Sequence, residues 1–293
     1  MKIPRFWAKS TAEDVDSSGR PIAFSCWRSS DVSEDDARES ALAVAQRTLR
    51  RWLAEGWHSG LPPSQYEYDS LPMREEVLER ICDSHGETLA AVTQNAYGAL
   101  VLNAARVLFI DLDFPPYSPW EWLWYHLQRL LRRPVQSPEE QREAAIRARL
   151  EAFVRQEPGG AVRLYRTFAG MRAIVIHKLY DPVAPATNAL LVALGTDPLY
   201  IRLCRAQECF RARLSPKPWR CEHRANPIRW PRETEEAQQA FERWQAKYVK
   251  RQAAYATCWF RETLGSERVH PEAAEILAIH DRMTRCQEPL ALA

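Results

Sequence analysis

The chain has 293 residues, of which 46% are hydrophobic and 27% charged, a balance that excludes a disordered protein and allows one large domain or two modest ones. Its 40 basic and 38 acidic residues give a net charge of +2, so any binding of nucleic acid or anionic lipid would have to be local. Because the apolar runs are far shorter than a bilayer span and the seven cysteines are scattered, we expect a soluble, cytoplasmic protein with reduced thiols and no membrane partner.

The N-terminal third predicts a hairpin followed by a helix. Weak alternation over 2–9 and the β-compatible run 21–27 flank a polar connection that ends in Ser-Ser-Gly. Ser33 then precedes three acids, and alanines and leucines continue at helical spacing to about Glu55. A loop rich in proline and tyrosine is expected near Leu61–Tyr68.

An antiparallel meander is expected next, over 76–82, 89–94, 99–102 and 106–113, because Asp83–Gly86 and Asn95–Gly98 supply turn residues between the first three segments. Ser118-Pro and Ser137-Pro, each followed by acids, predict helices over about 118–133 and 138–157.

The remaining chain predicts two strands, 162–168 and 172–178, joined at Ala169-Gly170, then short helices over 187–195 and 198–207 and a strand over 210–214. Two C-terminal helices are expected, roughly 233–263 and 271–286. Together these elements predict an α+β fold with a mixed, largely antiparallel sheet flanked by helices. We divide it into a core domain, 1–230, and a helical C-terminal region packed on it, 231–293.

Two acids end one apolar strand. Strand alternation sends Asp111 and Asp113 to the same side of the sheet, where their carboxylates could bind a divalent cation, Mg²⁺ or Mn²⁺. The alternative is that both acids lie at a solvated strand end or pair with nearby arginines.

The strand pair around Ala169-Gly170 carries a second group of candidates. Arg166 and Arg172, with Thr167, would cluster near the turn and form an anion-binding corner suited to phosphate. His177 is a candidate base or ligand, although a histidine near the far end of a strand is more often structural.

The strand and loop over 210–221 form the strongest local basic patch. Arg211 and Arg213 share a strand face, and Lys217 and Arg220 follow in a proline-stiffened loop that could hold them over a phosphate or a nucleic-acid backbone. The alternative is an arginine network that pairs with the carboxylates of neighbouring elements.

Cysteines and tryptophans suggest two further sites. Cys204, Cys209, Cys221 and His223 have the residue types of a zinc site, but their spacing is poor, and buried free thiols are the default. Trp120, Trp122 and Trp124 cannot all face one way, so they serve packing, an oligomer interface or a stacking platform for bases.

Four segments, MKIPRFWAK, NAYGALVLNAARVLFIDLDFP, RTFAGMRAI and AQECFRARLSPKPWR, resemble a widespread family of uncharacterised bacterial proteins over essentially the whole chain. More remotely, the order of the elements resembles the catalytic domain of archaeo-eukaryotic-type primases and primase-polymerases. Those domains carry an Asp-x-Asp strand end, a strand motif with a small-residue turn and a histidine, and then a further acid and a basic strand and loop.

The remote resemblance implies that Asp111 and Asp113 are the first of these elements and that Arg213 and Lys217 belong to the last. Asp197 would be the further acid. The middle element departs from the pattern, because Arg172 follows the turn where the histidine is expected and His177 comes later.

The sequence therefore predicts binding of a nucleotide or nucleic-acid phosphate through Arg166, Arg172, Arg211, Arg213 and Lys217. A metal ion on the two aspartates would support nucleotidyl or phosphoryl transfer, with Arg172 and His177 as further catalytic candidates. The alternatives are a non-catalytic nucleic-acid-binding protein and a structural protein that oligomerises through its tryptophan-rich helices.

Overall fold

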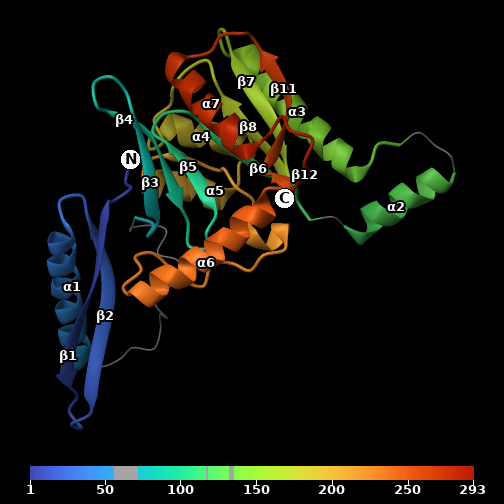
Figure 1. Cartoon of the computed structure of the whole chain (residues 1–293). Helices are drawn as coiled ribbons and strands as arrows, with labels where there is room; N and C mark the ends of the chain where they lie inside the picture. The colour runs from blue at the N-terminus through green and yellow to red at the C-terminus, as the bar shows by residue number, and fades with distance from the viewer. Residues whose placement is uncertain (56–71, 117, 132–134) are drawn as a thin grey trace.

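The N-terminal part of the chain is a long hairpin covered by one helix. The computed structural model describes residues 1–55, 72–116, 118–131 and 135–293. Strands β1 (Phe6–Val15) and β2 (Pro21–Ser30) pair antiparallel, and α1 (Glu34–Glu55) lies along them (Figure 1). The predicted hairpin and helix are confirmed, whereas the predicted loop Leu61–Tyr68 lies outside the described residues.

Two four-stranded antiparallel sheets form the body of the molecule. The first has the order β3-β4-β5-β9 and the second the order β11-β7-β8-β6. The strands are β3 (Glu76–Cys82), β4 (Thr88–Gln94), β5 (Leu100–Ala104), β6 (Phe109–Asp113), β7 (Ala161–Thr167), β8 (Gly170–Val175), β9 (Phe210–Arg213) and β11 (Cys258–Gly265).

The predicted meander holds only for its first three strands. The chain leaves the first sheet after β5, and β6 pairs with β8 in the second sheet. Phe109, Ile110 and Leu112 are all buried, so β6 is apolar on both faces and gains more inside a covered sheet than at the edge of the meander. The expectation that 106–113 continues the meander was therefore wrong.

Six helices follow α1 in the described part of the chain, together with a short 3₁₀ helix, and all of them except α2 pack near the sheets (Figure 1). They are α2 (Pro119–Leu130), α3 (Pro138–Gln156), α4 (Pro185–Ala193), α5 (Pro198–Gln207), η1 (Pro218–Cys221), α6 (Glu235–Gln252) and α7 (Pro271–Thr284). Ser118 and Ser137 form the capping boxes that open α2 and α3, as their sequences predict.

The long C-terminal helix predicted over 233–263 ends eleven residues early, at Gln252. After α6 the chain forms β10 (Tyr255–Ala256) and then β11, which pairs with β7. Cys258 and Leu264 are buried there, and β11 supplies hydrogen-bond partners to an edge of β7 that would otherwise stay unpaired. The short strand β12 (Ala291–Leu292) pairs parallel with β10.

The predicted fold class is confirmed: the protein is α+β with mostly antiparallel sheets, and its C-terminal region carries helices α6 and α7. Within the described ranges, no helix combines the length and the hydropathy needed to cross a bilayer. The division at residue 230 stays a prediction.

Candidate functional site

The two sheets meet where their edge strands β6 and β9 lie side by side. The buried Tyr200 hydroxyl joins them, since it donates to the Phe109 carbonyl at 3.1 Å and accepts from the Arg211 amide at 3.2 Å. Further along, Arg172, which lies opposite Asp111 in the sheet, donates to the Arg213 carbonyl at 2.9 Å. Both strands therefore run the same way, and their ends, Asp113 and Arg213, reach the same side of the molecule. We call this junction the seam.

Asp111 and Asp113 lie at the seam, at the end of β6. Asp111 is half-buried and Asp113 is exposed, and among the described residues neither side chain has a hydrogen bond or an ion pair. Partial removal from water and the negative charge of Asp111 both raise the pKa of Asp113. A bound cation would relieve both effects.

Three cations face these acids from β9 and the loop after it. The positive charges of Arg213 and Lys217 lower the pKa of Asp113, and the negative charge of Asp113 raises the pKa of Arg220. The described contacts nevertheless include no ion pair between these cations and the two acids. Burial and the positive charge of Arg213 lower the pKa of both Lys217 and Arg220. These three cations, called the basic group below, therefore repel one another, and a bound anion would reduce this repulsion.

The loop that carries Lys217 is held firmly by α6. The Tyr248 hydroxyl donates to the Pro216 carbonyl at 2.6 Å and lies 2.9 Å from the Ser215 hydroxyl. The Ser215 hydroxyl in turn accepts from the Leu100 amide of β5 at 2.8 Å. These buried contacts fix the backbone on which Lys217 and Arg220 stand, so the cations are positioned before any ligand arrives.

Asp197 adds a third carboxylate near the pair. Its amide donates to the Asp111 carbonyl at 3.3 Å, and its charge contributes to raising the pKa of Asp113. Its carboxylate also caps α5 by accepting from the Leu199 amide at 2.9 Å. In the described ranges no three potential ligands stand close enough to enclose a metal. A cation held by two carboxylates would complete its shell with water and phosphate oxygens, as Mg²⁺ commonly does.

Arg172 serves the seam through a buried network. Its guanidinium lies 3.2 Å from His280 Nε2, and His280 Nδ1 lies 2.9 Å from the Asp281 carboxylate of α7. These contacts place the proton of a neutral imidazole on Nδ1, so that Nε2 accepts from Arg172. Arg172 therefore ties β9 to its own strand, β8, and is buried away from any ligand.

The predicted corner of Arg166 and Arg172 is not formed. Arg166 lies opposite Met171, and Arg172 lies opposite Tyr165, so the two arginines point to opposite faces of the sheet. Arg166 is buried against α3 and forms ion pairs with Glu139 and Glu143. Successive residues of a strand point to opposite faces of the sheet. Arg166 therefore lies on the face opposite to that of Arg172 and Asp111.

Arg211 and His177 also lie apart from the acids. Arg211 is buried in an ion pair with Glu75, whose two carboxylate oxygens accept from the same guanidinium nitrogen, Nη2, at 2.7 and 2.8 Å. His177 is buried beyond the far end of β8, where its Nδ1 lies 3.1 Å from the Ala161 amide. Both residues thus have structural contacts away from the acids, and their phosphate and catalytic roles stay predictions.

The four residues considered for zinc do not gather at one place in the described part of the structure. Cys204 belongs to the main core, Cys209 packs beside Ile3, and Cys221 packs among the aromatic side chains of α6. His223 lies beside the same aromatic cluster as Cys221, with its ring tilted against that of Trp244 at 5.4 Å between centroids. Burial raises the pKa of the Cys204 thiol to about 12 and that of Cys209 to about 11, as expected for inert core thiols.

Three aromatic rings lie beside Lys217 and Arg220, and the sequence did not predict their presence there. Trp219 is 53% exposed and meets Tyr97 edge-on at 5.2 Å between centroids. The Arg220 guanidinium lies 4.3 Å from the ring centre of Phe168, which is 50% exposed. Trp219 is adjacent in sequence to Arg220, so its position could have been suspected, but Tyr97 and Phe168 come from remote turns. Together they form an aromatic rim beside the cations.

Acid should weaken the network behind the site. Burial, with the nearby charge of Arg172, lowers the pKa of His280 to about 4, below the ordinary value of about 6.5. Between about pH 6.5 and pH 4 the unfolded chain therefore binds a proton that the folded chain excludes. The free energy of unfolding should fall by up to about 3 kcal/mol as the pH drops through this range, and it should level off at lower pH. The measurement is urea unfolding at pH 7 and pH 5, with His280→Gln as the comparison. Equal pH dependence in both proteins would contradict this role of His280.

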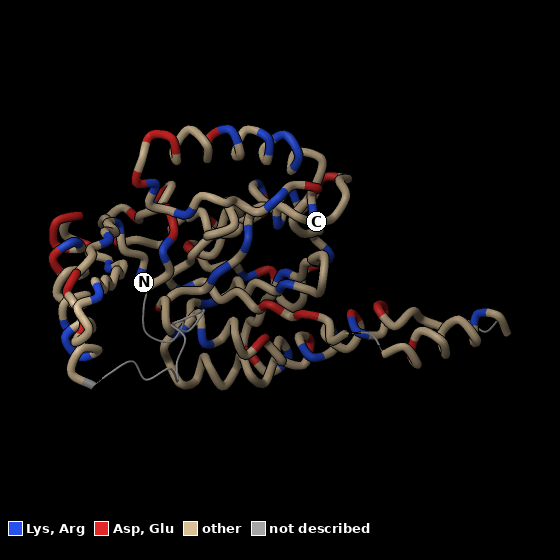
Figure 2. The backbone as a smooth tube through the Cα atoms, turned by 90° about the horizontal axis from the view of Figure 1, so that it is seen from below, with Lys and Arg blue, Asp and Glu red and all other residues tan. Residues whose placement is uncertain are grey.

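Comparison with known protein families, with curated proteins and with solved structures gives no match to this chain. Charged residues of both signs are also interspersed along the whole backbone (Figure 2), so no overall field indicates a ligand. The geometry of the seam is thus the basis for the function proposed below.

Proposed function

We propose that the chain binds the phosphates of a nucleotide or nucleic acid at the seam, together with a divalent cation, Mg²⁺ or Mn²⁺, on Asp111 and Asp113. The observation that carries the proposal is a set of opposite charges that form no ion pairs with one another or with other described residues. Two carboxylates and three cations influence each other electrostatically without closing into ion pairs. A metal–phosphate ligand satisfies both halves, because the metal neutralises the acids and the phosphate oxygens neutralise the bases.

The residues divide into three roles. Asp111 and Asp113 would hold the metal, which supplies neutralisation of charge on phosphate oxygens during nucleotidyl or phosphoryl transfer. Arg213, Lys217 and Arg220 would bind the phosphates. Arg172 is a positioning residue, since it holds the Arg213 backbone by one hydrogen bond and His280 by another.

The aromatic rim favours a nucleotide over inorganic phosphate. Exposed rings beside a phosphate site offer a surface on which a base can stack, and stacking tolerates any base because each has a π face. The remote resemblance to primase-polymerases supports the same ligand class. In this chain, however, Arg172 occupies the place of the family's histidine and acts as a brace, so phosphate binding is the core of the proposal and transfer is its extension.

Metal dependence tests the proposal. The purified protein is titrated with ATP in the presence of manganese and again in the presence of EDTA. The expected result is ATP binding that needs manganese. If an oligonucleotide binds in a manner that is sensitive to salt but insensitive to EDTA, the non-catalytic nucleic-acid-binding function replaces this one.

Trp219→Ala should weaken manganese–ATP binding by about 5- to 150-fold, the equivalent of losing one stacked base. It should leave binding of manganese–tripolyphosphate unchanged, because that ligand has no base. The matched control is Trp122→Ala in α2, which removes a tryptophan of similar exposure, 50%, outside the seam. Equal losses for both ligands would show that Trp219 does not contact a base.

A further inference from the structure

Among the residues that the structure describes, helix α2 has less packing than a helix of its length requires. It has 12 residues, none of them buried, and it extends away from the two sheets (Figure 1). Isolated helices of this size are marginal in water, even with a capping box such as that of Ser118 and Glu121. Its stability therefore points to a contact that covers one of its faces.

The uncovered face is a continuous apolar stripe. Its members recur at spacings of three and four residues, which places them on one side of the helix. Their exposure runs from 43% at Leu127 to 79% at Leu130. The apolar stripe comprises Trp120, Leu123, Trp124, Leu127, Leu130 and Leu131.

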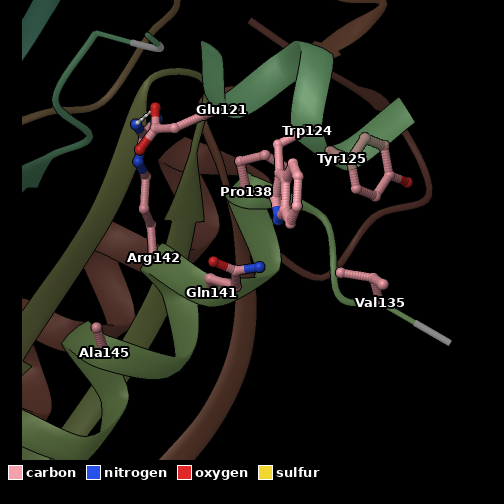
Figure 3. A pocket seen from close by; sticks show the side chains of 8 residues that line it. All are labelled: Glu121, Trp124, Tyr125, Val135, Pro138, Gln141, Arg142 and Ala145. Atoms are coloured by element: carbon pink, nitrogen blue, oxygen red, sulfur yellow. Dashed lines mark hydrogen bonds and ion pairs between the residues drawn. The ribbon is translucent and has the colours of Figure 1, made fainter. Parts of the chain in front are cut away.

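A cavity lies beside the stripe, between α2 and the start of α3. Figure 3 shows Trp124 extending over Pro138, with Val135 on the connection and the Glu121–Arg142 ion pair at the other end. That ion pair spans 3.0 Å. The cavity measures about 220 Å³, which gives room for a large apolar side chain. The region of α2 and the start of α3 thus carries both the exposed apolar stripe and a cavity with room for an apolar side chain.

We propose that the apolar stripe is covered by the same stripe of a second copy of this chain, with a side chain of each copy entering the cavity of the other. Reciprocal contacts between identical surfaces close into a twofold dimer. Two tryptophans and four leucines at this exposure present an area on the order of 600–800 Å², close to the ~800 Å² per partner of a standard interface. The area therefore suffices for a stable dimer without any other contact.

The test measures the mass of the full chain in solution by sedimentation between about 1 and 100 µM, a range that brackets micromolar association. The wild-type protein should be a dimer at the upper end. Leu123→Glu combined with Leu127→Glu should be a monomer throughout, because two charges would be buried at the centre of the interface. The control is Val192→Glu on α4, which introduces a charge at an exposed apolar position, 66% exposed, outside α2 and should leave the dimer intact.

Hydrogen exchange supplies a second readout that does not depend on the variants. Amides of 120–130 should exchange more slowly at the high protein concentration than at the low one. A wild-type monomer over the whole range would overturn the proposal. So would α2-dependent binding of the monomer to vesicles of phosphatidylglycerol, which would assign the stripe to a lipid surface.

Discussion

Asp111→Asn combined with Asp113→Asn should abolish detectable manganese binding, weakening it by at least about 100-fold. Loss of even an outer-shell partner of a metal costs about 10- to 100-fold, and this change removes both charged ligands themselves. The variant should fold normally, and its thermal midpoint should change little, because the relieved repulsion between the two acids is offset by their lost attraction to Arg213, Lys217 and Arg220. Manganese binding is measured by calorimetry, and the midpoint by circular dichroism.

The matched control for this pair is Asp35→Asn with Asp36→Asn, which changes the net charge equally in the first turn of α1. Manganese binding should survive there. Unchanged binding in the seam variant would refute the proposed metal site. Crystals soaked with manganese and ATP give a direct view, because anomalous density beside Asp111 and Asp113 would locate the ion.

Glu75→Ala should destabilise the protein by about 3–5 kcal/mol, the usual cost of leaving one partner of a buried ion pair alone. Glu75 accepts two hydrogen bonds from Arg211 and a third from the Thr93 hydroxyl at 2.6 Å, and both ionised residues are buried. Its removal leaves the Arg211 guanidinium with an uncompensated charge between β4 and β9. Chemical denaturation in urea measures the loss.

Two comparisons separate this cost from an ordinary mutational effect. Combining Glu75→Ala with Arg211→Met should recover much of the stability, since no unpaired charge remains. Glu262→Ala, which breaks the exposed pair with Arg147, should cost less than about 1 kcal/mol. If Glu75→Ala costs as little as Glu262→Ala, the ion pair with Glu75 does not hold Arg211 in place. Arg211 would then again be a candidate for phosphate binding.

Interactions within a few residues were predictable from the sequence because they need no remote partner. The capping boxes at Ser118 and Ser137 satisfy the first amides of their helices through side chains three residues away. Gly98 closes the β4–β5 turn with a positive φ of 94°, a conformation that favours glycine. Such signals predicted most strands and helices and the α+β class.

Contacts between remote segments decided what the sequence left open. The C-terminal segment after Gln252 has residues acceptable in a helix, but the open edge of β7 made part of it a strand. Gly170 pairs with Asp113, and a Cβ there would stand 2.2 Å from the Leu112 carbonyl, so the small residue allows β8 to approach the acids. Neither fact can be recognised before the partner strand is known.

The candidate site shows the same division. Strand alternation alone placed Asp111 and Asp113 on one side, because successive side chains of a strand point to opposite faces. Pairing register then separated Arg166 from Arg172, and burial beside Glu75 separated Arg211 from Arg213. By itself, the sequence determined the local elements and the two-acid strand end, since these depend on neighbours along the chain. Only the tertiary structure decided which cations and rings surround those acids, because β9, the loop after it and the turns bearing Tyr97 and Phe168 meet there through packing between distant segments.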